Sequence, residues 1–245
     1  MKRFALALAA LAGSSAVSAL NARTSPEDLS VYILLDRTGS MSSIWDEALN
    51  SVNAYAEELA KDEADETALD IDVSLAVFDA QDGLEFDMLR RNADPEAWRP
   101  LTSDEASPRG MTPLFDAIGA MLTVAEADRP ERAVLVVMTD GEENSSRELT
   151  KDNVRERLDR ARKKGWEVVF LGAEFANFAD ASAVGVSAQK SMGVSKDGMA
   201  ETMRRLSGKT KEYGKAAEPA AAPIEFDAED RAVAGEDEVK DKDPL

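Results

Sequence analysis

Short apolar segments alternate along this chain with segments of helical periodicity, and this alternation limits the folds that the chain can adopt. Segments of strand length that consist almost entirely of apolar residues occupy residues 29–35, 133–138 and 166–171. Such runs are typical of strands covered on both faces. The first run is followed by apolar residues at helical spacing, namely Trp45, Leu49, Val52, Ala56 and Leu59. The pattern predicts a doubly wound α/β fold, with a mostly parallel sheet and helices on both faces.

One part of the chain departs from strict alternation of strand and helix. Residues 69–78 alternate between apolar and polar side chains, Asp82-Gly83 is a turn signal, and residues 84–88 alternate again. Two alternating runs joined by a short turn predict an antiparallel hairpin with one solvent-facing side. We expect this hairpin at an edge of the otherwise parallel sheet.

The two ends of the chain differ from its middle. A short basic start, an apolar run and small residues up to Ala19 form the three parts of a secretory signal peptide. We predict a signal peptide over residues 1–19, a linker over 20–28, the folded domain over 29–214 and a disordered acidic tail over 215–245. The leader indicates an exported protein, periplasmic or secreted, without an integral membrane segment in the mature chain. The alternative is an uncleaved leader on a cytoplasmic protein.

Two missing residue types restrict the chemistry. The 245 residues include no Cys and no His. Their absence excludes disulfides, thiolate and imidazole metal ligands, and catalysis of the Ser-His-Asp or Cys-His kind. A metal site must therefore be built from oxygen, which suits hard cations such as Mg²⁺, Ca²⁺ and Mn²⁺. The formal net charge of −19 argues against nucleic acid or anionic lipid as a partner.

Three short polar segments fall at the carboxyl ends of predicted strands or in the loops that follow. They are residues 36–41 (Asp-Arg-Thr-Gly-Ser-Met), 110–114 (Gly-Met-Thr-Pro-Leu) and 139–141 (Thr-Asp-Gly). Each alone is compatible with ordinary turn or helix-cap chemistry. Together they bring two carboxylates and three hydroxyls to the sheet edge at which doubly wound folds bind ligands. An octahedral cation requires about six oxygens, some of which are water.

These segments resemble the metal-ion-dependent adhesion site of von Willebrand factor A domains. That site has an Asp-x-Ser-x-Ser loop after the first strand, a Thr in a later loop, and an Asp in a Thr-Asp-Gly turn. The matching positions in this chain are Asp36, Thr38, Ser40, Thr112 and Asp140. Thr38 departs from the usual Ser of the family but keeps the hydroxyl. The resemblance covers roughly residues 29–214.

The resemblance implies a metal-dependent protein-binding module and not an enzyme. By this likeness the three hydroxyls would bind Mg²⁺ or Mn²⁺ directly, and the two aspartates would bind it directly or through water. A partner protein would present an Asp or Glu to the remaining coordination position. From adjacency in the sequence, we expect Ser42, Met111 and Gly141 to form the rim that contacts the partner.

Two alternatives stay open at this point. One is a scaffold of the same fold that binds no metal. The other is a Mg²⁺-dependent phosphohydrolase with Asp36 as nucleophile, similar to the haloacid-dehalogenase type. Those enzymes have a second Asp two residues later, where this chain has Thr38. A dinucleotide-binding enzyme is excluded, because no Gly-x-Gly-x-x-Gly follows the first strand.

Overall fold

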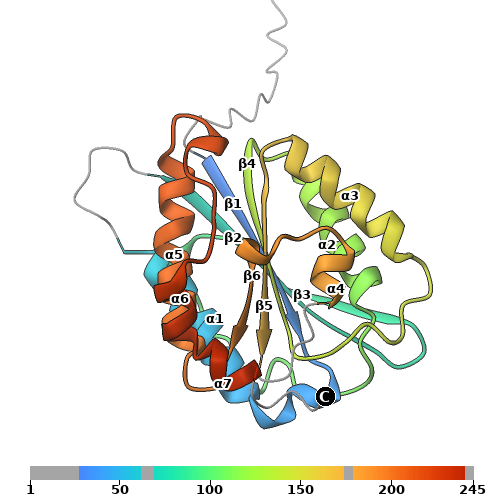
Figure 1. Cartoon of the computed structure of the whole chain (residues 1–245). Coiled ribbons are helices and arrows are strands. Elements are labelled where there is room, and N and C mark those ends of the chain that lie inside the picture. The colour runs from blue at the N-terminus through green and yellow to red at the C-terminus, as the bar shows by residue number, and fades with distance from the viewer. Residues whose placement is uncertain (1–27, 62–68, 174–178, 241–245) are drawn as a thin grey trace, which may run out of the picture.

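A six-stranded sheet runs through the centre of the computed structural model, which describes residues 28–61, 69–173 and 179–240 (Figure 1). The strand order is β3-β2-β1-β4-β5-β6. Only β2 and β3 pair antiparallel, and the other neighbours are parallel. The predicted fold class and the edge position of the hairpin are thereby confirmed. The strands are β1 (Asp28–Asp36), β2 (Asp70–Ala80), β3 (Leu84–Ala93), β4 (Arg132–Thr139), β5 (Glu167–Ala173) and β6 (Ser191–Val194).

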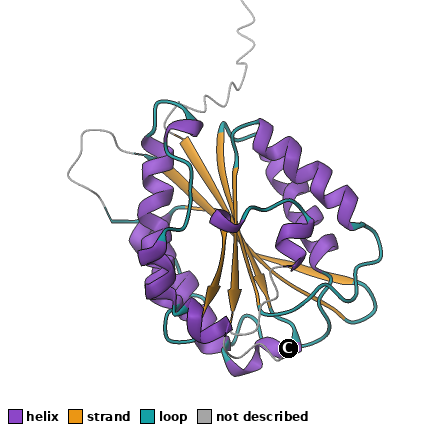
Figure 2. Cartoon of the chain, in the orientation of Figure 1, coloured by secondary structure: helices purple, strands orange, loops and turns teal. Residues whose placement is uncertain are grey.

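Helices cover both faces of the sheet (Figure 2). None of the helices in the described part of the chain is long and apolar enough to cross a membrane. The α-helices are α1 (Trp45–Leu59), α2 (Leu114–Asp128), α3 (Lys151–Lys163), α4 (Ala179–Ala183), α5 (Met199–Lys215), α6 (Ala228–Ala234) and α7 (Glu236–Lys240). The short 3-10 helices are η1 (Gly39–Ser43), η2 (Pro95–Ala97), η3 (Ala188–Lys190) and η4 (Pro219–Ala221).

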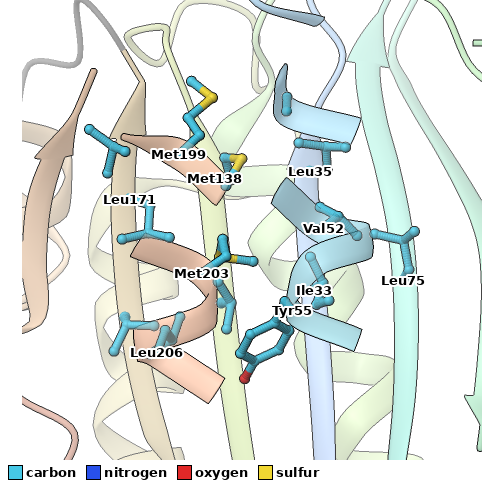
Figure 3. Packing of buried hydrophobic residues seen from close by; sticks show 14 of the residues in the cluster. Ile33, Leu35, Val52, Tyr55, Leu75, Met138, Leu171, Met199, Met203 and Leu206 are labelled. Atoms are coloured by element: carbon cyan, nitrogen blue, oxygen red, sulfur yellow. The ribbon is translucent and has the colours of Figure 1, made fainter. Parts of the chain in front are cut away.

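The alternation of side chains along the central strands divides the core into two layers. In β1, Ile33 and Leu35 belong to the layer shared with α1 and α5, whereas Tyr32 and Leu34 belong to the layer shared with α2 and α3. Figure 3 shows the first layer, in which Met203 of α5 and other apolar side chains of the two helices pack over the sheet. Because both faces are covered, the central strands contain continuous apolar runs.

The hairpin differs from its prediction in one respect. Glu85 and Asp87 of β3 are exposed, as expected for a strand with a wet face. In β2, however, every residue from Val73 to Ala80 is buried. Ala76 and Phe78 of β2 lie in the layer formed with α2, so the solvent-facing side is confined to the outermost strand.

The prediction of a disordered tail over residues 215–245 is wrong for the part that the structure describes, which ends at Lys240. Lys215 is the last residue of α5, and α6 and α7 follow it. Ile224 and Phe226 are buried in the layer that α1 and α5 form with the sheet. The Phe226 amide donates to the Gln189 carbonyl at 2.7 Å. These two apolar anchors alternate with the exposed Glu225, but a pattern of three residues in an acidic and alanine-rich segment is too short to predict an element.

Electrostatics also attach this segment to α5. Arg205 Nε donates to Asp230 Oδ1 at 2.8 Å, and Lys209 Nζ lies 2.9 Å from the other oxygen of the same carboxylate. These pairs hold the pKa of Asp230 below its ordinary value, although burial opposes the shift. The predicted signal peptide lies outside the described residues. So does the predicted linker, except for Asp28, which begins β1.

We predict that Ile224→Ala lowers the free energy of unfolding by about 2–5 kcal/mol, because it removes a fully buried branched side chain. The neighbouring Glu225→Ala is the matched control, since Glu225 is exposed and its replacement costs less than about 0.5 kcal/mol. Urea denaturation of the full chain measures both. Equal effects of the two substitutions would show that the segment does not pack as described.

Candidate metal centre

The predicted site residues lie at the carboxyl ends of the two central strands and in the neighbouring loop. β1 and β4 pair in parallel, with Leu35 opposite Met138. Asp36 ends β1, and Asp140 directly follows β4. Parallel strands that share a register end at the same edge, so the two aspartates belong to one edge of the sheet. The loop before α2 joins them because Met111 pairs with Ala80 at the end of β2.

Asp36 is fully buried and receives hydrogen bonds from neutral donors. The Thr38 amide donates to Asp36 Oδ1 at 2.7 Å, and the Thr139 hydroxyl donates to Oδ2 at 2.6 Å. Thr139 comes from β4, so these bonds also connect the first and third segments. Both carboxylate oxygens are oriented by the fold before any ligand binds.

Hydroxyl groups connect the first segment to Asp140. Ser40 Oγ donates to Asp140 Oδ1 at 2.7 Å, and Thr38 Oγ1 lies 3.2 Å from Ser40 Oγ. Ser40 sits in η1, which begins directly after Thr38. Thr38 and Asp140 are almost completely buried, whereas Ser40 is exposed. The cluster therefore opens to solvent on the side of Ser40.

Thr112 is held against the third segment. A Cβ atom on Gly141 would lie only 2.9 Å from Thr112 Oγ1, so the threonine hydroxyl rests directly on this glycine. The Thr112 amide donates to Asn144 Oδ1 at 2.9 Å, and the Asn144 amide donates to the Thr112 carbonyl at 3.0 Å. The structure thus brings all five predicted ligand positions to one sheet edge, and contacts link all three segments.

The loop after Asp140 is fixed by two carboxylates. Asp116 of α2 accepts hydrogen bonds from the amides of Arg147 and Leu149, both at 2.7 Å. Glu143 accepts from the Phe115 amide at 2.9 Å. These contacts dock the loop on the start of α2 and thereby hold Gly141 against Thr112.

Burial makes ionisation of the two aspartates costly. Desolvation raises the pKa of Asp36 to about 7, against hydrogen bonds that lower it, and the charge of Asp140 adds to the increase. Desolvation likewise raises the pKa of Asp140, while the Ser40 hydroxyl lowers it. Two buried carboxylates that meet only neutral donors constitute uncompensated negative charge, which a bound cation would neutralise.

The arginine beside Asp36 does not supply this compensation. Arg37 Nε donates to Asp79 Oδ1 at 2.7 Å, and Arg37 Nη2 lies 2.7 Å from Asp87 Oδ2. Arg109 Nε donates to the other oxygen of Asp79 at 3.1 Å. The fully buried Asp79 therefore connects the first segment to the loop before Thr112. Asp79 positions both loops and forms ion pairs with Arg37 and Arg109.

The donor set fits a hard divalent cation. The cluster supplies oxygen atoms only, from two carboxylates and three hydroxyls, and Mg²⁺ and Mn²⁺ prefer oxygen ligands. Within the described residues, no three acidic side chains converge so that they could hold a metal. A cation at this edge would therefore depend on the neutral hydroxyls as well as on Asp36 and Asp140.

The predicted rim residues lie on the accessible side of the same loops. Ser42 is exposed and donates to the Gly39 carbonyl at 2.7 Å. Met111 has 53% of its surface exposed. Gly141 is half-buried beneath Thr112.

Sequence reasoning did not identify Thr139, Asn144 or Asp79 as positioning residues. Thr139 had a detectable signal, because it is the first residue of the Thr-Asp-Gly segment.

Comparison with known proteins identifies the family and the fold. A family model of the von Willebrand factor type A domain matches residues 30–216, whereas no curated protein sequence matches the chain. Among solved structures, the chain is similar to the manganese-loaded TRAP protein of Plasmodium vivax, with a TM-score of 0.53, 16% identity and 72% of each chain covered.

Two other solved structures show the same fold. One is the vWF domain of the type V pili tip protein Mfa5 from Porphyromonas gingivalis, with a TM-score of 0.53, 11% identity, and 78% of this chain and 97% of that chain covered. The other is proximal thread matrix protein 1 from the mussel byssus, with a TM-score of 0.51 and 14% identity. That match covers 76% of this chain but only 46% of the mussel protein. Identities this low establish the fold alone.

We predict that Asp79→Asn lowers the free energy of unfolding by about 3–5 kcal/mol, because it leaves the buried Arg37 without a full counter-charge. Asp87→Asn is the matched control: it removes the other carboxylate of the same arginine, but its side chain is 51% exposed. Its effect should stay below about 1 kcal/mol. Chemical denaturation compares the two, and a larger loss in Asp87→Asn would contradict the assigned role of Asp79.

Proposed function

The chain belongs to the von Willebrand factor type A family, and from this membership we propose that it is a metal-dependent protein-binding module and not an enzyme. The observation that carries the proposal is the joining of Asp36, Asp140 and three hydroxyls at one sheet edge, with both carboxylates buried among neutral donors.

Each residue has a role in this proposal. Thr38, Ser40 and Thr112 would bind Mg²⁺ or Mn²⁺ through their hydroxyls. Asp36 and Asp140 would balance the positive charge, either directly or through water. Thr139 and the Thr38 amide hold both oxygens of Asp36, so the site loses little conformational freedom when it is filled. The hydrogen bond from Ser40 to Asp140 would be exchanged for contacts to the cation.

The proposed partner is a protein that presents an Asp or Glu side chain. When bound, the cation supplies an electrophilic coordination position that such a carboxylate can fill. Ser40 is the exposed ligand, so the partner would approach from its side. Ser42, Met111 and Gly141 would form the rim around that approach. With a net charge of −19, the chain would repel nucleic acid, which we exclude as a partner.

Structural relatives support this proposal without establishing it. The TRAP structure is described as manganese-loaded, and Mfa5 is described as a pilus tip protein. The first is compatible with a divalent cation in this fold, and the second with a location outside the cell. Export of this chain, as a periplasmic or secreted protein, remains our proposal.

We predict that Mg²⁺ at about 100 times its Kd raises the free energy of unfolding by about 2.7 kcal/mol, since the cation binds only the folded chain. Asp140→Asn and Ser40→Ala should abolish most of this gain. Ser42→Ala is the matched control, because Ser42 carries a hydroxyl in the same 3-10 helix but contacts the Gly39 carbonyl instead of Asp140. Chelator should return the parent protein to its metal-free stability.

The two alternatives are distinguishable in the same experiment. A parent protein whose stability does not respond to Mg²⁺ or Mn²⁺, and which shows no saturable site by calorimetry, is the metal-free scaffold. Hydrolysis of a generic phosphoester that is lost in Asp36→Asn would instead support the phosphohydrolase. Either result would overturn the proposed function.

A further inference from the structure

The surface around the candidate site is built from small residues. Gly39, Ser40, Ser42 and Gly110 are all exposed there. Gly110 has φ +71, and a Cβ atom on it would lie 2.3 Å from the Ala80 carbonyl oxygen, so only glycine fits. At Gly39, by contrast, a Cβ would come no closer than 3.6 Å to the Gly110 oxygen. Packing does not require glycine at position 39. Because glycine has no side chain, nothing projects from the surface beside Thr38 and Ser40 at this position.

Met111 is the exception on this low surface. It is 53% exposed, and it is the only large apolar side chain that is exposed within the described parts of the chain. It directly precedes Thr112, whose hydroxyl belongs to the site. All other large apolar side chains of the described ranges are buried or half-buried, although single exposed apolar residues are common in proteins generally.

The backbone of Met111 is held firmly. Its amide donates to the Ala80 carbonyl at 2.9 Å, and its carbonyl accepts from the Ala80 amide at 2.9 Å. The tight glycine before it and the Thr112–Asn144 bonds after it fix both neighbours. Because the backbone at Met111 is already fixed, the segment loses little backbone conformational entropy when a partner covers the methionine side chain.

We propose that the partner's metal-binding Asp or Glu is flanked by an apolar side chain, and that Met111 selects the partner by packing against that side chain. This inference rests on the proposed function, because it assigns the partner chemistry of the same site. The low Gly and Ser surface lets the partner backbone come close enough for both contacts. The flexible, polarisable thioether accommodates several apolar shapes, so the preference is for apolar character and not for one residue type.

Three short peptides test the proposal on the full chain in saturating Mg²⁺: acetyl-Leu-Glu-Leu-amide, acetyl-Ser-Glu-Ser-amide and acetyl-Leu-Gln-Leu-amide. Shifts of the Gly110 and Thr112 amide signals in NMR titrations give the affinities. We expect the Leu-Glu-Leu peptide to bind about tenfold more tightly than Ser-Glu-Ser, since a half-exposed methionine becomes buried. The Leu-Gln-Leu peptide, which lacks the carboxylate, should bind weakest.

Substitutions of Met111 separate its side chain from the rest of the site. Met111→Ser should reduce the preference for Leu over Ser to less than about twofold, and Met111→Leu should restore it. Neither change removes the main-chain hydrogen bonds between residue 111 and Ala80, and thermal denaturation verifies that both variants fold.

Calorimetry with Mg²⁺ alone distinguishes failure of the proposed function from failure of this inference. A parent protein that binds no Mg²⁺ overturns the proposed function and this inference with it. A parent protein that binds Mg²⁺ and the Glu peptides, but with equal affinity for Leu-Glu-Leu and Ser-Glu-Ser, overturns this inference alone. A preference for Leu that persists in Met111→Ser also overturns it.

Discussion

The parallel pairing of β1 with β4 at the centre of the sheet is the constraint on which the rest of the structure depends. Both strands are buried on both faces, so their register is fixed by the two core layers. That register brings the end of β1 and the end of β4 to the same level. Asp36 and Thr139 then meet through a 2.6 Å hydrogen bond, and Asp140 follows within reach of Ser40. A slip of one residue would separate these groups.

Most of the fold could be predicted because hydrophobic periodicity reports directly on burial. The continuous apolar run of residues 133–138 corresponds to β4, a strand that is buried along its whole length. The C-terminal segment could not be predicted in this way. Its anchors, Ile224 and Phe226, are isolated in an acidic and alanine-rich stretch. They are buried in the core layer that α1 and α5 form with the sheet, and no local pattern specifies this packing.

The candidate site shows a similar division. The five predicted positions lie in short motifs that resemble those of the family, and the fold brings the loops that contain these motifs to one edge of the sheet. The supporting contacts could not be found from spacing. Asn144 holds Thr112, and Asp116 holds the loop after Asp140, through hydrogen bonds between residues about thirty positions apart. Amides and carboxylates of this kind are common on any surface. Only the folded backbone determines which of them orient a ligand.

The distribution of charge at this edge is compatible with the proposed cation site, although an arginine directly follows Asp36 in sequence. Arg37 directly follows Asp36 in sequence, and a salt bridge between such neighbours would neutralise the site. Arg37 lies just past the end of β1, and its guanidinium group pairs with Asp79 and Asp87. Asp79, at the end of β2, then receives Arg37 and Arg109 together. The arginines are thereby neutralised outside the cluster, and Asp36 and Asp140 keep a negative charge that burial makes unfavourable. The fold thus keeps the positive charges of Arg37 and Arg109 apart from Asp36 and Asp140, where a bound cation would stabilise the folded chain.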